Sequence, residues 1–61
     1  MNMTDRERII LALRLGGLLE AENSPDIGEN YIVTAVGGYG NMQDIVFRFN
    51  NEGSLLMISE N

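Results

Sequence analysis

The chain has 61 residues and contains neither cysteine nor histidine. A domain of this size buries only ~60% of the surface that its unfolded chain exposes, and small domains usually gain stability from a disulfide, a metal or a partner subunit. The composition excludes a disulfide and a Cys–His zinc site, so a partner subunit is the remaining device. We therefore predict one domain, residues 1–61, that associates with itself as a homodimer.

Residues 4–22 have the composition and the N-terminal signature of a helix. Thr4 and Glu7 form a capping box, in which the hydroxyl accepts a hydrogen bond from the amide three residues on and the carboxylate reaches back. The segment that follows is rich in Leu, Ala, Arg and Glu, which are good helix formers.

Gly16-Gly17 interrupts this segment, and each glycine costs about 1 kcal/mol relative to alanine inside a helix. Two interpretations are open. We favour a continuous helix over residues 4–22, in which the glycines let a second backbone approach closely. The other interpretation is a helix that ends at Leu15 with a short segment after it.

The predicted helix is apolar on nearly all sides. At 100° per residue, Ile9 and Leu13 lie on one side of it. Leu11 and Leu18 lie on nearly the opposite side. Because one small sheet covers only one side, we expect the helix or the back of the sheet to form the homodimer interface.

The rest of the chain alternates strand-like segments with turns. Three segments are enriched in β-branched and aromatic residues: 31–36, 44–49 and 55–58. Residues 37–41 and 50–53 are expected to connect them, with Gly53 in a left-handed conformation. Residues 23–30 are expected to form a polar loop and 59–61 a frayed tail. The fold class is therefore α+β, with one N-terminal helix packed on a three-stranded antiparallel β-meander.

Alternation along residues 44–49 assigns the two faces of this sheet. Ile45, Phe47 and Phe49 are expected to face the helix. The opposite face is expected to carry Val46, Leu56 or Met57, and some of Ile32 and Val36. Such a face is too apolar to remain in contact with water, so it is a candidate partner surface.

The composition also restricts the chemistry of the chain. Without Cys, His or Lys, it lacks the usual nucleophiles, bases and transition-metal ligands. The spacing of its acidic residues does not match a calcium-binding EF-hand loop. We therefore expect no enzyme activity, no metal site and no cofactor.

The net charge is −5, and no base lies between Arg14 and Arg48. Nucleic-acid binders carry a basic stripe, so direct binding to DNA or RNA is not expected. An acidic surface suits a basic groove of a partner protein, although solubility alone is the alternative role for this charge. The candidate partner-binding residues are Glu20, Glu22, Asp26, Glu29, Tyr39, Asp44 and Glu52. Tyr39 is the candidate aromatic contact at a hairpin tip.

No segment indicates membrane insertion or export. The longest nearly apolar stretch, residues 9–19, is interrupted by Arg14 and is too short to span a bilayer. The mixed charge of the first eight residues does not fit a signal peptide. We expect a cytoplasmic protein with no membrane partner.

Residues 45–60 read Ile-Val-Phe-Arg-Phe-Asn-Asn-Glu-Gly-Ser-Leu-Leu-Met-Ile-Ser-Glu. This order resembles the central hairpin of a family of small phage anti-CRISPR proteins, which inhibit the RNA-guided DNA nuclease of type II-A CRISPR systems. With the strand at 31–33 and the N-terminal helix, the resemblance covers about half of the chain. It implies a DNA mimic that occupies the DNA-recognition groove of the nuclease, with Glu52 as a contact acid. The family has a second acid where this chain has Leu55.

These observations favour a small acidic inhibitor of phage type, which binds and blocks a bacterial anti-phage defence protein in the host cytoplasm. The binding surface is either the acidic residues or the apolar face of the sheet. Two other functions stay open. One is a homo-oligomer that sequesters a small nucleotide-like ligand through Arg48 and Tyr39, and the other is a small structural accessory subunit.

Overall fold

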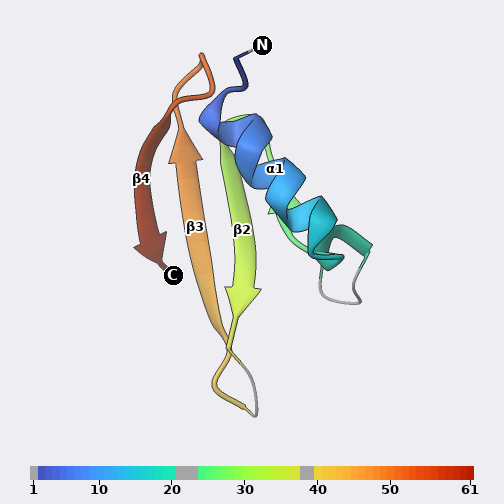
Figure 1. The fold of residues 1–61 in the computed structure, drawn as a ribbon. Helices are drawn as coiled ribbons and strands as arrows, with labels where there is room; N and C mark the ends of the chain where they lie inside the picture. The colour runs from blue at the N-terminus through green and yellow to red at the C-terminus, as the bar shows by residue number, and fades with distance from the viewer. Residues whose placement is uncertain (1, 21–23, 38–39) are drawn as a thin grey trace.

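The computed structural model describes residues 2–20, 24–37 and 40–61. Along the chain the elements are α1 (Asp5–Leu15), the 3-10 helix η1 (Leu18–Glu20), β1 (Asp26–Ile27), β2 (Tyr31–Val36), β3 (Gln43–Phe49) and β4 (Leu55–Glu60). The strands form one antiparallel sheet in the order β1-β2-β3-β4, and α1 lies beside β2 (Figure 1). The α+β class is therefore confirmed, but the sheet has four strands and not three.

The capping box at the start of α1 is confirmed. Thr4 Oγ1 accepts from the Glu7 amide at 3.1 Å, and Glu7 Oε1 accepts from the Thr4 amide at 3.3 Å. These two bonds satisfy amides that have no partner within the helix.

The preference for a helix continuous over residues 4–22 is wrong, and the alternative of a helix that ends at Leu15 is correct. Gly17 adopts a φ of 74°, in the left-handed region that a helix cannot continue through. The Gly16 amide donates to Ala12 O and the Gly17 amide donates to Arg14 O, both at 3.0 Å. Two carbonyls of the last turn are thus satisfied, and the chain turns into η1; residues 21–23 lie outside the described residues.

Two further sequence predictions need correction. The segment 23–30 was predicted to be a polar loop, but Asp26 and Ile27 form β1 by pairing with Val33 and Ile32. Residues 59–61 were predicted to be a frayed tail, but β4 continues to Glu60 because residues 59 and 60 pair with β3.

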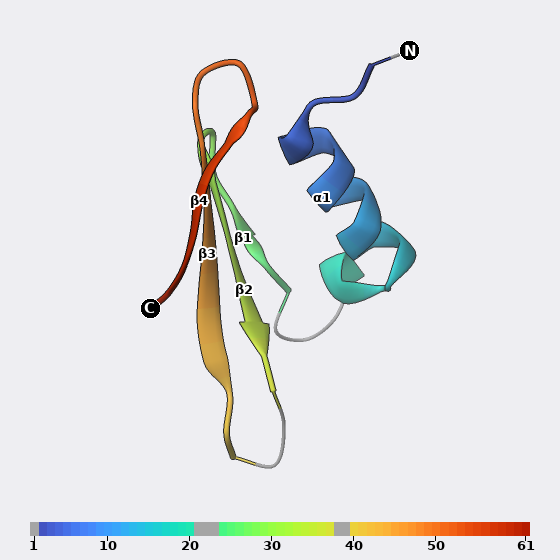
Figure 2. The same cartoon turned by 60° about the vertical axis from the view of Figure 1, so that its left-hand side comes forward.

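The core lies between α1 and one face of the sheet (Figure 2). Its buried residues are Leu13, Ile32 and Phe49, with Ile32 0% exposed. Phe47 packs against them, which confirms that Phe47 and Phe49 face the helix, and Ile45 lies on the same face by alternation. The assignment of Ile32 to the opposite face is wrong, because its register partner is Phe47.

The face of the sheet turned away from α1 has no covering element among the described residues (Figure 2). Val46 and Met57 lie on it, as expected, whereas Val36 shares the helix-side face of Ile32. The register places Arg48 between Tyr31 and Met57 in one row across this face. The molecule is a slab of 38 × 23 × 14 Å, in which one short helix covers part of one face.

Candidate interaction surface

The β3–β4 turn, residues 50–54, is held by hydrogen bonds within itself. Asn50 Oδ1 accepts from the Glu52 amide and from the Ser54 amide, both at 2.9 Å. The Gly53 amide donates to Asn50 O at 3.0 Å, and Gly53 has a φ of 82°, as the sequence predicts. The Glu52 side chain is therefore exposed on a turn whose backbone is fixed on both sides of it.

The first turn of α1 binds this hairpin turn directly. Asp5 Oδ2 accepts from the Leu55 amide at 2.8 Å, and the Arg6 amide donates to Gly53 O at 3.0 Å. A Cβ atom built on Gly53 would lie only 2.8 Å from the Thr4 Cβ atom. The helix N-terminus and the turn thus contact each other at the distance that glycine alone permits.

The loop between β1 and β2 joins the same end of the sheet. Asn30 Nδ2 donates to Asn51 Oδ1 at 3.1 Å, and the Arg6 guanidinium donates to Gly28 O at 2.8 Å. Glu29 is exposed in this loop. We call the residues 28–30 and 50–54 the hairpin end, and it carries Glu29 and Glu52 as exposed acids.

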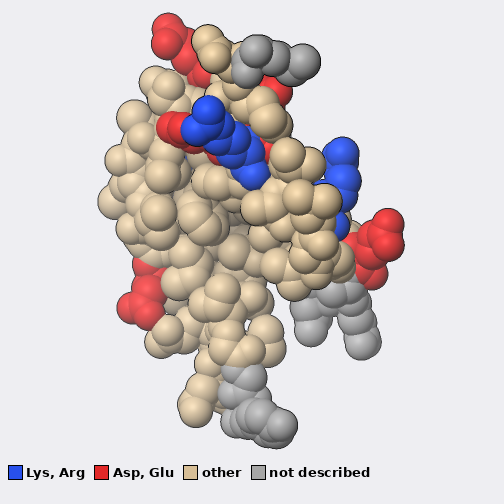
Figure 3. All heavy atoms as spheres, viewed as in Figure 1, with Lys and Arg blue, Asp and Glu red and all other residues tan. Residues whose placement is uncertain are grey.

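The other candidate acids lie elsewhere. Glu20 is in η1, Asp26 begins β1, and Asp44 is on β3 opposite Ala35, toward the β2–β3 end of the sheet. All three are exposed. Figure 3 shows acidic atoms both at the hairpin end and near the end of β4, so the acids do not form one patch. Glu22 and Tyr39 lie outside the described residues.

The charge is divided unevenly between the helix and the rest of the chain. Arg6, Arg8 and Arg14 outnumber Asp5 and Glu7 on α1, which leaves this helix with a net charge of +1. The remaining residues contain seven acids and one arginine, a net charge of −6. Any attraction to a basic partner must therefore come from the sheet and the loops.

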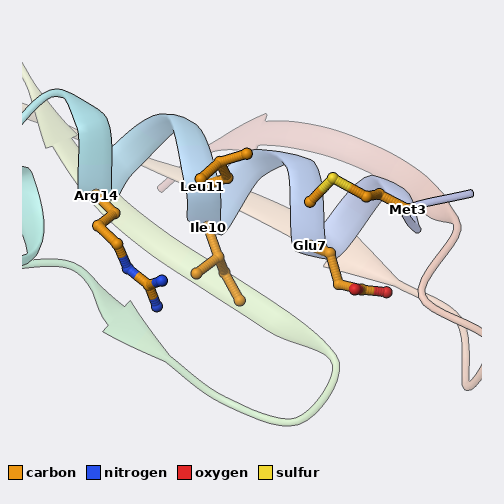
Figure 4. A pocket seen from close by; sticks show the side chains of 5 residues that line it. All are labelled: Met3, Glu7, Ile10, Leu11 and Arg14. Carbon is orange, nitrogen blue, oxygen red and sulfur yellow. The ribbon is translucent and has the colours of Figure 1, made fainter. Parts of the chain in front are cut away.

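Two apolar surfaces are exposed. On the edge strand β4, Leu56 is 66% exposed, and Met57 and Ile58 are also exposed. The second surface is a groove of about 220 Å³ along α1, lined by Met3, Glu7, Ile10, Leu11 and Arg14, of which Ile10 also packs against the core (Figure 4). Both exposures follow from the small area that α1 and the sheet bury against each other.

Asp5, Asn30 and Asn51, which position Glu52, are not among the candidate residues predicted from the sequence. Asp5 was interpreted as part of a helix start, and Asn30 and Asn51 as loop residues. Their hydrogen bonds join parts of the chain 50 and 21 residues apart. The Asn50-Asn51-Glu52-Gly53 pattern predicts the turn, but no local signal predicts which segments bind it.

Within residues 2–20, 24–37 and 40–61, no three acidic side chains are grouped so that they would hold a metal ion. No helix in the described part of the chain is long and apolar enough to cross a membrane. Comparisons with protein-family models, with curated proteins and with solved structures found no match.

Proposed function

We propose that this chain is a non-catalytic inhibitor that binds a basic surface of a partner protein through the hairpin end, with Glu52 as the central contact. The hairpin resemblance extends the proposal to its target, a bacterial anti-phage defence protein such as a CRISPR nuclease, in the cytoplasm of the host cell. The observation that carries the proposal is the hydrogen-bonded turn that presents the exposed Glu52.

A fixed turn favours binding because little conformational entropy is lost when it docks. An exposed carboxylate on such a turn forms short, charge-assisted hydrogen bonds with an arginine or lysine of a partner. Glu29 lies at the same end and adds a second acid within the same contact area. The negative charge of the sheet and loops then supports binding to a groove that normally holds nucleic acid.

The remaining candidate acids, Glu20, Asp26 and Asp44, have a different role in this proposal. They are exposed and lie outside the hairpin end, so they attract the partner over a longer range. Such charges mainly raise the association rate, and salt screens them beyond ~8 Å at physiological ionic strength.

The test is inhibition of DNA cleavage by a purified, guide-loaded nuclease of a type II-A CRISPR system. We expect the wild-type chain to inhibit cleavage, and less strongly as salt rises. Glu52→Lys should raise the concentration needed for half-inhibition by more than about tenfold, because a direct ion pair becomes a repulsion.

Glu20→Lys is the matched control, since it makes the same charge change in η1. Its effect should be about threefold or less and should lie in the association rate. Circular dichroism should show both variants folded. Equal losses for the two variants would contradict the assignment to the hairpin end, and absence of inhibition by the wild type would contradict the target.

One observation favours a second candidate, sequestration of a small nucleotide-like ligand. Arg48 lies beside Tyr31 on the uncovered face of the sheet, and an arginine next to an aromatic ring suits a phosphate and a base. In that case nucleoside phosphates should bind in calorimetry, and Arg48→Ala should abolish the binding while inhibition by the hairpin end persists.

A further inference from the structure

We propose that the groove along α1 is the surface on which a second copy of this chain docks, with the two α1 helices antiparallel. The surface is a stripe that consists of the residues lining the groove, Met3, Glu7, Ile10, Leu11 and Arg14, and the exposed Leu18 lies beyond it in η1. The proposal goes beyond inhibition and does not rest on it, because the contacts lie outside the hairpin end.

The stripe follows the helical repeat. Within α1, Glu7 lies three and four residues before Ile10 and Leu11, and Arg14 lies four and three residues after them, so these four lie along one side of the helix. Figure 4 shows the side chains of Glu7, Ile10 and Arg14 along one flank of the groove and that of Leu11 on the other flank. Met3 lies at the N-terminal end of the groove. Leu11, Leu18 and both charged residues are exposed, so the stripe is accessible to a partner.

The stripe is complementary to itself when it is reversed. In a two-fold symmetric pair, each contact between residues i and j occurs twice. A two-fold axis between Ile10 and Leu11 places Glu7 of one copy opposite Arg14 of the second copy, and the reverse. These charges are seven residues, about 10.5 Å, apart on each helix, so both ion pairs form together.

The same axis matches the apolar residues. Ile10 meets Leu11 of the second copy at the centre. Glu7 keeps its capping role, because its Oε1 atom accepts from Thr4 and its other oxygen is free to accept from an arginine. The surface has an acid at one end, a base at the other and an apolar centre. This order favours binding of a second copy over binding of a protein that lacks it.

The docking leaves the two hairpin ends free. The first turn of α1 is hydrogen-bonded to the β3–β4 turn, so antiparallel helices place the two hairpin ends at opposite ends of the dimer. It also covers Leu11, whose side chain is 38% exposed in the single copy. A domain of this size gains stability from such a partner.

The test is sedimentation of charge variants, alone and mixed. The wild type should sediment at twice 6.8 kDa at micromolar concentration. Arg14→Glu and Glu7→Arg should each raise the dissociation constant more than about tenfold, because two attractive pairs become two repulsive ones. An equimolar mixture of the two variants should form a heterodimer, because every pair across its interface is then attractive.

Two further variants keep the test decisive. Arg8→Glu makes the same charge change on the part of α1 turned away from the stripe, and it should dimerise as the wild type does. Leu11→Arg changes an exposed residue at the centre, so the chain should stay folded and become monomeric. A wild type that is monomeric, an Arg14→Glu dimer as stable as the Arg8→Glu dimer, or a mixture that stays monomeric would each overturn the proposal.

Discussion

The two ends of the sheet are organised differently. At the hairpin end, backbone and side-chain hydrogen bonds join the first turn of α1, the β3–β4 turn and the β1–β2 loop. At the opposite end α1 has already ended, and Val36 and Met42 are exposed beside the β2–β3 connection. Figure 1 shows this second end extending beyond the helix. Hydrogen bonds therefore hold the hairpin end, which carries the candidate contact acids, in a fixed arrangement. The apolar core lies between the two ends of the sheet.

The largest effect expected within this comparison comes from strand β2, which runs from one end to the other. Ile32→Ala removes the fully buried side chain at the hairpin half of the strand and should lower the free energy of unfolding by about 3–4 kcal/mol. Val36→Ala, on the same face at the open end, should cost less than about 1 kcal/mol. Urea denaturation of both variants measures the difference, and similar losses would contradict the contrast between the ends.

A smaller effect is expected from two glycines with nearly the same backbone conformation. Gly53 and Gly40 have φ values of 82° and 86°, so alanine costs each about 1–2 kcal/mol. At Gly53 the new Cβ atom also meets the Thr4 Cβ atom at 2.8 Å, while at Gly40 it meets nothing within 4 Å. Gly53→Ala should therefore lower the free energy of unfolding by about 1 kcal/mol more than Gly40→Ala does. Equal losses in thermal denaturation would show that α1 does not contact the turn this closely.

Local sequence patterns predict the helix start and the turn at the hairpin end, but they do not predict the contacts between these segments. The capping box needs only Thr4 and Glu7, and the turn needs only residues 50–53, so both follow from neighbouring residues. The preferred prediction for the end of α1 is wrong, because a glycine pair either stays helical or adopts positive φ, and tertiary context selects one of them. Strand β1 has only two residues, and it is a strand only because it pairs with β2.

The assignment of residues to the two faces of the sheet also depends on contacts that local patterns do not predict. Alternation correctly groups Phe47 with Phe49, but placing Ile32 requires the register between two strands, and a shift of one residue reverses the assignment. Of the candidate acids, Glu52 is placed by its turn, and Glu29 joins it only through the Asn30–Asn51 hydrogen bond. Asp44 lies toward the opposite end because β3 runs away from the turn.

Backbone ¹⁵N relaxation of the wild-type chain tests whether Glu52 is presented on a fixed turn. Residues 51–55 should have order parameters of about 0.85, the value typical of rigid backbone, because the backbone amides of residues 52, 53, 54 and 55 all donate hydrogen bonds. Order parameters below about 0.6 across the same residues, which indicate a flexible loop, would contradict the account.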